Sequence, residues 1–155
     1  MGTNVTISLA GAAAKTEIRS MLSSYLAELG AYGEANLDYP YFDAYWSERG
    51  RRWPYLIHAG SDVIGFAFVR ALSDRGADYS LAEFYIRPEA RRGGRGIEAA
   101  KAVLAAHPGV WQRSVFLLNT PARAFWPKAI AAAGLEAPEC LEEHGKTVYR
   151  FAVPK

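Results

Sequence analysis

The chain has 155 residues, of which half are hydrophobic and 22% are charged, a balance typical of a globular protein rather than a disordered one. Its 18 Lys and Arg residues against 16 Asp and Glu leave a net charge of only +2, which argues against nucleic acid as a partner. No apolar run approaches the ~18 residues of a membrane span and the N-terminus lacks the pattern of a signal peptide, so we expect a cytoplasmic protein with a single domain over residues 1–155 and no membrane partner.

The first half of the chain predicts one strand, two helices and a hairpin. Residues 5–9 alternate between apolar and polar side chains, as in a strand, and apolar residues then recur at helical spacing from Lys15 until Gly30 ends the helix. A short second helix is expected at about residues 41–49. Two β-rich runs follow, joined by a Gly-Ser-Asp turn, and they predict strands over residues 53–59 and 63–70.

The second half alternates strands and helices. A turn at residues 73–76 leads into a strand over residues 79–86, and a final strand is expected at residues 147–153. Between them we expect a helix at 97–106, a strand at 110–118, a helix at 121–133 and a short strand at 135–141. Pro127 lies inside the second of these helices and predicts a kink or a later start there.

A glycine-rich and arginine-rich loop opens the helix at 97–106. It contains Gly93, Gly94 and Gly96, which let successive backbone N–H groups point into one concavity at the helix start, where an anion is favoured. The loop also carries Arg91, Arg92 and Arg95, whose forked donors suit phosphate. A merely solvated turn has no need of three glycines at this place, so the sequence predicts a site for a phosphorylated ligand.

Two known phosphate-binding patterns do not fit this loop. A P-loop closes on Lys followed by Ser or Thr, whereas Gly96 is followed by Ile97 and Glu98. A dinucleotide fingerprint needs the spacing G-x-G-x-x-G and an acid about twenty residues later. Neither is present.

The loop instead resembles the pyrophosphate loop of the GNAT superfamily of acyl-CoA N-acyltransferases, in which Arg or Gln-x-x-Gly-x-Gly or Ala lies between a strand and a helix. Here the matching residues are Arg91, Gly94 and Gly96, and the preceding strand ends Phe84-Tyr85-Ile86, with Pro88 after it. A second segment, Asn119-Thr120-Pro121-Ala122-Arg123-Ala124-Phe125-Trp126, resembles the family's Asn-x-x-Ala-x-x-Phe-Tyr, and Gly134-Leu135 follows where members usually carry Gly-Phe.

The resemblance implies an α/β (α+β) fold with a mixed, mostly antiparallel central sheet of six to seven strands flanked by about four helices. It implies an N-acetyltransferase that uses acetyl-CoA as co-substrate, needs no metal, and transfers the acetyl group directly to an amine in a ternary complex. A rival interpretation keeps the fold and the CoA site but makes the protein a sensor without turnover. The arginine cluster could also mark a nucleic-acid-binding module, which the near-neutral charge disfavours. The oligomeric state stays open, a homodimer included.

The resemblance also assigns the cofactor-binding residues. Backbone N–H groups of residues 92–96 (Arg92, Gly93, Gly94, Arg95 and Gly96) would cradle the pyrophosphate, while the side chains of Arg91 and Arg92 could reach the 3′-phosphate. Backbone groups of Phe84 and Ile86 would pair with the pantetheine arm and stabilise the oxyanion. The remaining residues implied near the pantetheine are Asn119, Phe125 and Trp126, although a Phe-Trp pair on an amphipathic helix is as often simple core.

The catalytic residues follow from chemistry. Glu83 is a carboxylate inside an apolar strand, where burial would raise its pKa toward the value a general base needs, although it could also be an ion-pair partner on a solvent face. His58 is the alternative base. Many family members carry a Tyr in place of Trp126 as general acid, so we expect Tyr85 to serve here, with Tyr79, Tyr149 or an unassisted thiolate as alternatives.

Two further features complete the expectations. The only cysteine, Cys140, excludes an intrachain disulfide and a cysteine-based metal cluster, and it is not expected to be a nucleophile because it lies outside both motifs. The segment at residues 32–46 is rich in aromatic and acidic side chains, which would suit a cationic amine or simply pack the helices onto the sheet. The identity of the acceptor is not predicted.

Overall fold

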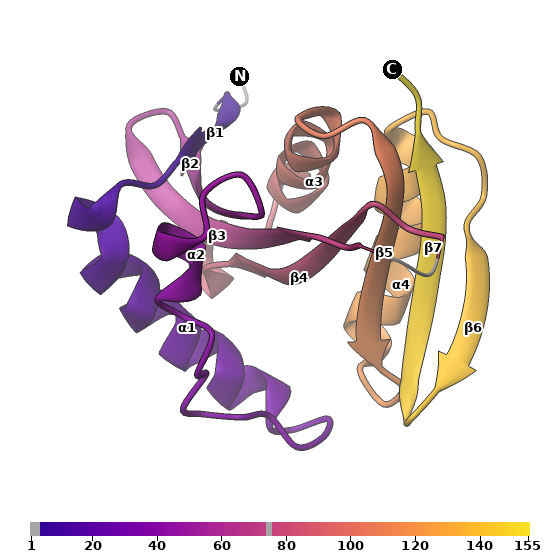
Figure 1. Ribbon diagram of the computed structural model, residues 1–155, viewed down its shortest axis with the longest axis horizontal. Coiled ribbons are helices and arrows are strands. Elements are labelled where there is room, and N and C mark those ends of the chain that lie inside the picture. Colours follow the sequence, from indigo (N-terminus) through magenta and orange to yellow (C-terminus); the bar gives the residue numbers. More distant parts are fainter. Residues whose placement is uncertain (1–3, 74–75) are drawn as a thin grey trace.

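The structure, a computed structural model, describes residues 4–73 and 76–155. Seven strands form one sheet in the order β1-β2-β3-β4-β5-β7-β6 (Figure 1). The strands are β1 (Val5–Leu9), β2 (Arg52–Ala59), β3 (Asp62–Ala71), β4 (Tyr79–Ile86), β5 (Gly109–Phe116), β6 (Glu139–Glu143) and β7 (Lys146–Val153). The helices are α1 (Lys15–Leu29), α2 (Ala44–Ser47), α3 (Arg95–Ala105) and α4 (Thr120–Ala132), with short 3₁₀ turns at Ala12–Ala14 and Pro88–Ala90.

The expected order of elements and fold class are confirmed, and the differences are local. The helix expected at residues 41–49 is only the single turn of α2, because turns occupy the residues before it. The strand expected at 135–141 is β6, which is set by its tight hairpin with β7 through His144 and Gly145, both with positive φ. Helix α4 begins at Thr120 and runs past Pro127, so the later start is wrong. The turn expected at 73–76 lies partly outside the described residues.

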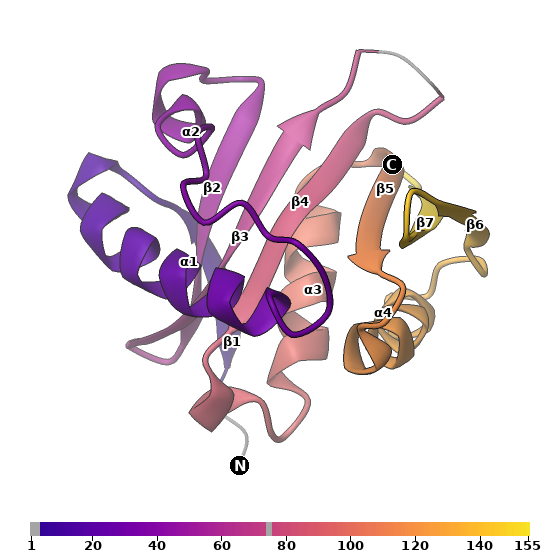
Figure 2. The same ribbon diagram turned by 90° about the horizontal axis from the view of Figure 1, so that it is seen from below.

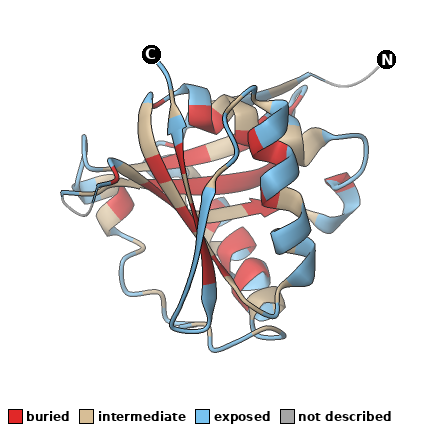
Figure 3. Ribbon diagram, turned by 90° about the vertical axis from the view of Figure 1, so that its right-hand side faces the viewer, coloured by how far each residue is buried: buried red, intermediate tan, exposed pale blue. Residues whose placement is uncertain are grey.

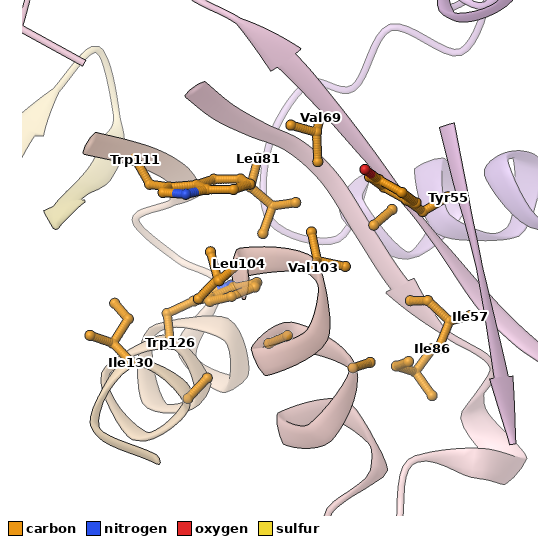
Figure 4. Packing of buried hydrophobic residues seen from close by; sticks show 14 of the residues in the cluster. Tyr55, Ile57, Val69, Leu81, Ile86, Val103, Leu104, Trp111, Trp126 and Ile130 are labelled. Carbon is orange, nitrogen blue, oxygen red and sulfur yellow. The ribbon is translucent and has the colours of Figure 1, made fainter. Parts of the chain in front are cut away.

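Helices cover the two faces of the sheet in pairs. Figure 2 shows α1 and α2 on one side of β2, β3 and β4, with α3 and α4 on the other. Buried residues gather along the middle of the sheet (Figure 3), whereas β6 is exposed throughout. On the α3/α4 face, residues including Tyr55, Val69, Leu104, Trp111 and Trp126 form one core (Figure 4). On the α1/α2 face, a second core joins Met21, Leu22 and Tyr25 of α1 to Phe66 and Phe68 of β3.

Strands β4 and β5 pair only briefly. They are parallel neighbours at Tyr79↔Trp111 and Ser80↔Gln112, and beyond that point they turn away from each other (Figure 1). The buried Arg113 of β5 replaces the missing strand pairing, because its Nη1 donates to the carbonyls of Leu81 (3.1 Å) and Ala82 (3.3 Å). Beyond these bonds β4 has an unpaired edge, which is where a ligand can add to the sheet.

Candidate functional site

The glycine-rich loop presents backbone donors at the start of α3. Gly93 and Gly94 have φ of 79° and 75°, the left-handed region that favours glycine. Among the described residues, no backbone carbonyl accepts a hydrogen bond from the N–H groups of residues 92–96; the first pairing N–H belongs to Glu98, which donates to Gly94 at 3.0 Å. Unpaired N–H donors and the helix dipole both favour an anion at such a place, as the sequence predicts for this loop.

The three loop arginines have different environments. The Arg91 guanidinium donates to Glu28 of α1 at 2.7 Å and to the carbonyl of Ile86 at 2.8 Å, and it lies 5.5 Å from the centre of the Tyr85 ring. Arg92 is exposed, and Arg95 makes only a 3.5 Å bond to the carbonyl of Arg92. Arg91 therefore ties the loop to α1 and β4, which competes with the expected phosphate contact, whereas Arg92 lies on the surface.

The edge of β4 offers backbone groups to the gap between the strands. Arg87 donates its N–H to Ile64 of β3, and alternate residues of an antiparallel pair bond to the same neighbour. The backbone groups of Phe84 and Ile86 therefore point away from β3, toward the gap left by β5. The side chain of Phe84 packs on the α3/α4 face of the sheet. The centre of its ring lies 5.9 Å from that of Phe125 and 5.1 Å from that of Trp126.

This gap is a cleft of about 320 Å³, which we call the strand cleft. The expected site residues among those that line it are Phe84, Tyr85, Ile86, Arg91, Gly96, Asn119, Phe125 and Trp126. Asn119 caps α4, because its Oδ1 accepts a 3.2 Å hydrogen bond from the N–H of Ala122. Trp126 is fully buried and belongs to the core as well as to the cleft wall, and a contact of the Phe-Trp pair with pantetheine stays a prediction.

A second cavity, the polar pocket, lies on the α1/α2 face. It measures about 520 Å³ and extends over the sheet from β2 to β7. Four residues line both cavities and mark their junction: Tyr25, Leu29, Arg113 and Asn119. Glu83 lines the polar pocket next to this junction. A molecule in the strand cleft and another in the polar pocket would therefore meet beside Glu83.

The carboxylate of Glu83 is held by Tyr39. The Tyr39 hydroxyl donates to Oε2 of Glu83 at 2.8 Å. Burial raises the pKa of Glu83 above its ordinary value, while the charge of Arg113 and the hydrogen bond from Tyr39 act in the opposite direction. Among the described residues, no Lys or Arg lies within ion-pair distance of this carboxylate, so the alternative of a surface ion pair is not seen.

The candidate acids and the alternative base lie in different places. Tyr85 is buried and lines the strand cleft, and burial raises its pKa. Tyr79 packs against Trp53 at the other end of the sheet, and Tyr149 donates to the carbonyl of Arg123. His58 bonds to Ser8 at 2.7 Å on the β1–β2 pair. Of these residues, only Tyr85 lines either cavity.

Of the four residues at the junction, only Asn119 was identified from the sequence, whereas Tyr25, Leu29 and Arg113 were not. Tyr25 has the spacing of an ordinary core position of the first helix, and no local signal marks it. Arg113 could have been found, because in the strand at 110–118 it shares the phase of the apolar residues Trp111 and Val115. A charged residue in that phase needs partners, and here these are two backbone carbonyls and the Trp126 ring at 5.2 Å.

Over residues 4–73 and 76–155, no group of three or more His, Cys, Asp or Glu side chains could hold a metal ion. Within the same ranges, no helix combines the length and the apolar character needed to cross a membrane. Cys140 is a free, exposed thiol on β6 and lines neither cavity.

Solved structures with the same fold include several acetyltransferases. An acetyltransferase of the GNAT family from Streptococcus agalactiae aligns with a TM-score of 0.72 at 14% identity, covering 100% of this chain and 99% of the other. An acetyltransferase from Thermus thermophilus aligns with a TM-score of 0.65 at 19% identity, covering both chains completely. AAC(6')-Ib, solved in complex with ribostamycin and coenzyme A, aligns with a TM-score of 0.68 at 16% identity, covering 97% of this chain and 93% of the other.

At these identities the structural likeness shows the fold alone. Among proteins of curated function, none matches the sequence of this chain. The family model described as the acetyltransferase (GNAT) family matches residues 18–130, a span that contains β4, the glycine-rich loop and almost all of α4. Since that match covers most of the chain, this protein belongs to the GNAT family of acetyltransferases.

Proposed function

We propose that this protein is an acetyl-CoA-dependent N-acetyltransferase that acts on the primary amine of a small molecule or peptide by direct transfer in a ternary complex. The observation that carries the proposal is the junction of the two cavities. The strand cleft begins at the donor-rich loop and ends beside Tyr25 and Arg113, where the polar pocket begins with Glu83 in its wall. A donor and an acceptor can thus be bound together.

The residues present fit acetyl-CoA, whose thioester would supply the acetyl group. The free N–H groups of residues 92–96 would hold its pyrophosphate, with the exposed Arg92 free to contact a phosphate. Backbone groups of Phe84 and Ile86 at the open edge of β4 would form hydrogen bonds with the pantetheine arm. One of their N–H groups would donate to the carbonyl oxygen of the acetyl thioester. Asn119, Phe125 and Trp126 would wall this arm. AAC(6')-Ib, a structural neighbour, was solved with coenzyme A.

Glu83 is proposed as the general base. Its raised pKa suits proton removal from an ammonium near neutral pH, and its place beside the junction puts it next to a bound amine. Tyr85 is proposed as the proton donor to the leaving sulfur, because burial keeps its phenol protonated. In the overall step, a C–N bond to the acetyl carbon replaces the thioester C–S bond. Glu83 takes one proton from the ammonium, Tyr85 gives its proton to the leaving sulfur, and the second proton that the nitrogen loses returns to the Tyr85 phenolate.

The proposal is tested by incubating the protein with acetyl-CoA and a panel of primary amines. Thiol release and the mass of the N-acetyl product are measured together, so that simple thioester hydrolysis is recognised. Transfer to an amine, with a lower kcat for Tyr85→Phe than for Tyr149→Phe, whose phenol lines neither cavity, is the expected result. Tight coenzyme A binding without transfer to any amine would favour the sensor interpretation instead.

A further inference from the structure

One row of cross-strand neighbours crosses the sheet beneath the polar pocket. Each position in the row pairs with the next, from β2 through β3, β4 and β5 to β7 and β6. The residues of the row are Arg52, Arg70, Ser80, Gln112, Arg150 and Glu139. The first four of them line the polar pocket, as does Glu83. The floor of this pocket is therefore rich in donors.

The charges around the pocket are predominantly positive. The cationic side chains that line it are Arg52, Arg70, Arg113 and Lys146, against Glu34 and Glu83 as the acidic ones. Of the acidic residues in the segment at 32–46, only Glu34 lines the pocket: Asp38 does not, and Asp43 pairs with Lys15 at 2.7 Å. A polycationic acceptor would meet a field of its own sign here.

Arg52 and Arg70 are directly opposite each other on β2 and β3. Like charges at such positions destabilise a sheet, so this pair gains little from a purely structural role. The Arg52 guanidinium is held in place by Glu48 at 3.1 Å and by the rings of Tyr41 and Tyr45 at 5.4 and 5.3 Å. An anion between the two arginines would relieve their repulsion.

Gln112 and Ser80 continue this donor surface. The Nη2 of Arg150 donates to Oε1 of Gln112 at 3.4 Å, which leaves the amide N–H groups of Gln112 available to the pocket. Ser80, which carries a hydroxyl, also lines this pocket. Two forked guanidinium groups, an amide and a hydroxyl together match the acceptor-only oxygens of a carboxylate.

We infer that the acceptor is a small amino acid-type molecule, whose amine lies at Glu83 and whose carboxylate binds to Arg52, Arg70, Gln112 and Ser80. The inference rests on the proposed function.

Ala82 is an extra residue in β4, because Glu83 pairs with Phe68 and Leu81 with Val69. Glu83 thus lies opposite Phe68, and Ser80 lies opposite Arg70. Phe68 and Arg70 are two residues apart on β3, so the positions of Glu83 and Ser80 are separated by about 7 Å along the strand. About six bonds of an extended chain cover that distance.

The test compares ω-amino acids of increasing length with n-alkylamines and α,ω-diamines of the same length. 6-Aminohexanoate, hexylamine and 1,6-diaminohexane form the matched set nearest to the expected span. We expect kcat/KM for the amino acid to exceed that for either other amine about tenfold or more, since charge-assisted hydrogen bonds are made only by the carboxylate. Arg70→Gln should reduce this preference to near one, whereas Arg49→Gln, an exposed arginine that does not line the pocket, should preserve it.

Binding gives a readout that does not depend on turnover. Calorimetry should detect 6-aminohexanoate binding to the unmodified protein and to Arg49→Gln, and weaker binding by at least about tenfold to Arg70→Gln. Amino acid binding that depends on Arg70 but yields no acetyl product would keep the anion site and overturn the proposed function. If alkylamines or diamines are acetylated as well as the best amino acid, the function stands and the inference is wrong.

Discussion

The Tyr39 hydroxyl donates a 2.8 Å hydrogen bond to Oε2 of Glu83, and it does so from a backbone with φ of 42°. A left-handed conformation costs a non-glycine residue about 1–2 kcal/mol, so the surrounding contacts must hold it. The Tyr39 ring packs 6.0 Å from Phe68, the cross-strand neighbour of Glu83. The segment between α1 and α2 is thereby fastened to the residue proposed as general base.

Glu83→Gln should reduce turnover about 10²–10⁴-fold while the affinity for coenzyme A stays unchanged, because it removes the base and keeps the shape. The loss should shrink toward about pH 9, where more of the acceptor amine is already neutral. Glu136→Gln, which removes an exposed carboxylate outside both cavities, is the control. Full activity of Glu83→Gln over about pH 6 to pH 9 on an established acceptor would place the base elsewhere.

The same substitution should raise stability at alkaline pH. Because burial raises the folded-state pKa of Glu83, the native protein holds this proton more tightly than the unfolded chain, so stability falls as pH rises from the unfolded value of 4.5 through the folded one. The unfolding temperatures of Glu83→Gln and of the unmodified protein should therefore be similar at about pH 4.5. As pH rises, the unfolding temperature of the variant should increase relative to that of the unmodified protein. A difference that does not vary with pH would contradict this.

Tyr39→Phe should move the acid limb of the pH–rate profile to higher pH. The Tyr39 hydrogen bond favours the ionised carboxylate, so its loss raises the pKa of Glu83 further. The drop in kcat/KM should be largest below neutral pH and should recover under alkaline conditions. Tyr79 lies at the start of β4, against Trp53, so Tyr79→Phe should not change the pH–rate profile.

Gly94→Val should abolish coenzyme A binding in a folded protein. In the free protein, a Cβ at Gly94 meets no atom within 4 Å, so the effect comes from the φ of 75° and from the space that the pyrophosphate needs. Gly50→Val is a matched control, since Gly50 has φ of 80° and equal space but lies outside the glycine-rich loop. Both variants should lose similar stability, but calorimetry should show lost affinity only for Gly94→Val.

Arg92→Gln should weaken coenzyme A about tenfold or more and leave pantetheine binding unchanged, because it removes one charge-assisted phosphate contact. Arg91→Gln should weaken both ligands, since Arg91 holds the loop to Glu28 and to Ile86 at the cleft wall. Calorimetry with both ligands separates the two cases. Equal losses for Arg92→Gln would mean that it too acts through the loop.

The sequence by itself determined the order of the elements and the donor-rich loop. Apolar periodicity marks the strands and helices, and Gly93, Gly94 and Gly96 act within a few residues of one another, so local spacing is enough to recognise them. Glu83 was found for a similar reason, since a carboxylate in an apolar strand is conspicuous. Local patterns placed the ends of the short elements α2 and β6 less well, because hairpin pairing and the packing of turns set those ends.

The tertiary structure alone decided which residues surround Glu83 and what charge the polar pocket carries. Tyr39 and Glu83 are 44 residues apart in the chain and meet only because the segment after α1 folds back over β4. The row from Arg52 to Gln112 exists only through the register of four strands, and a shift of one residue would turn its side chains to the opposite face. The acidic residues that would suit a cationic amine are local in sequence, whereas the arginines proposed to bind a carboxylate come together only across the sheet.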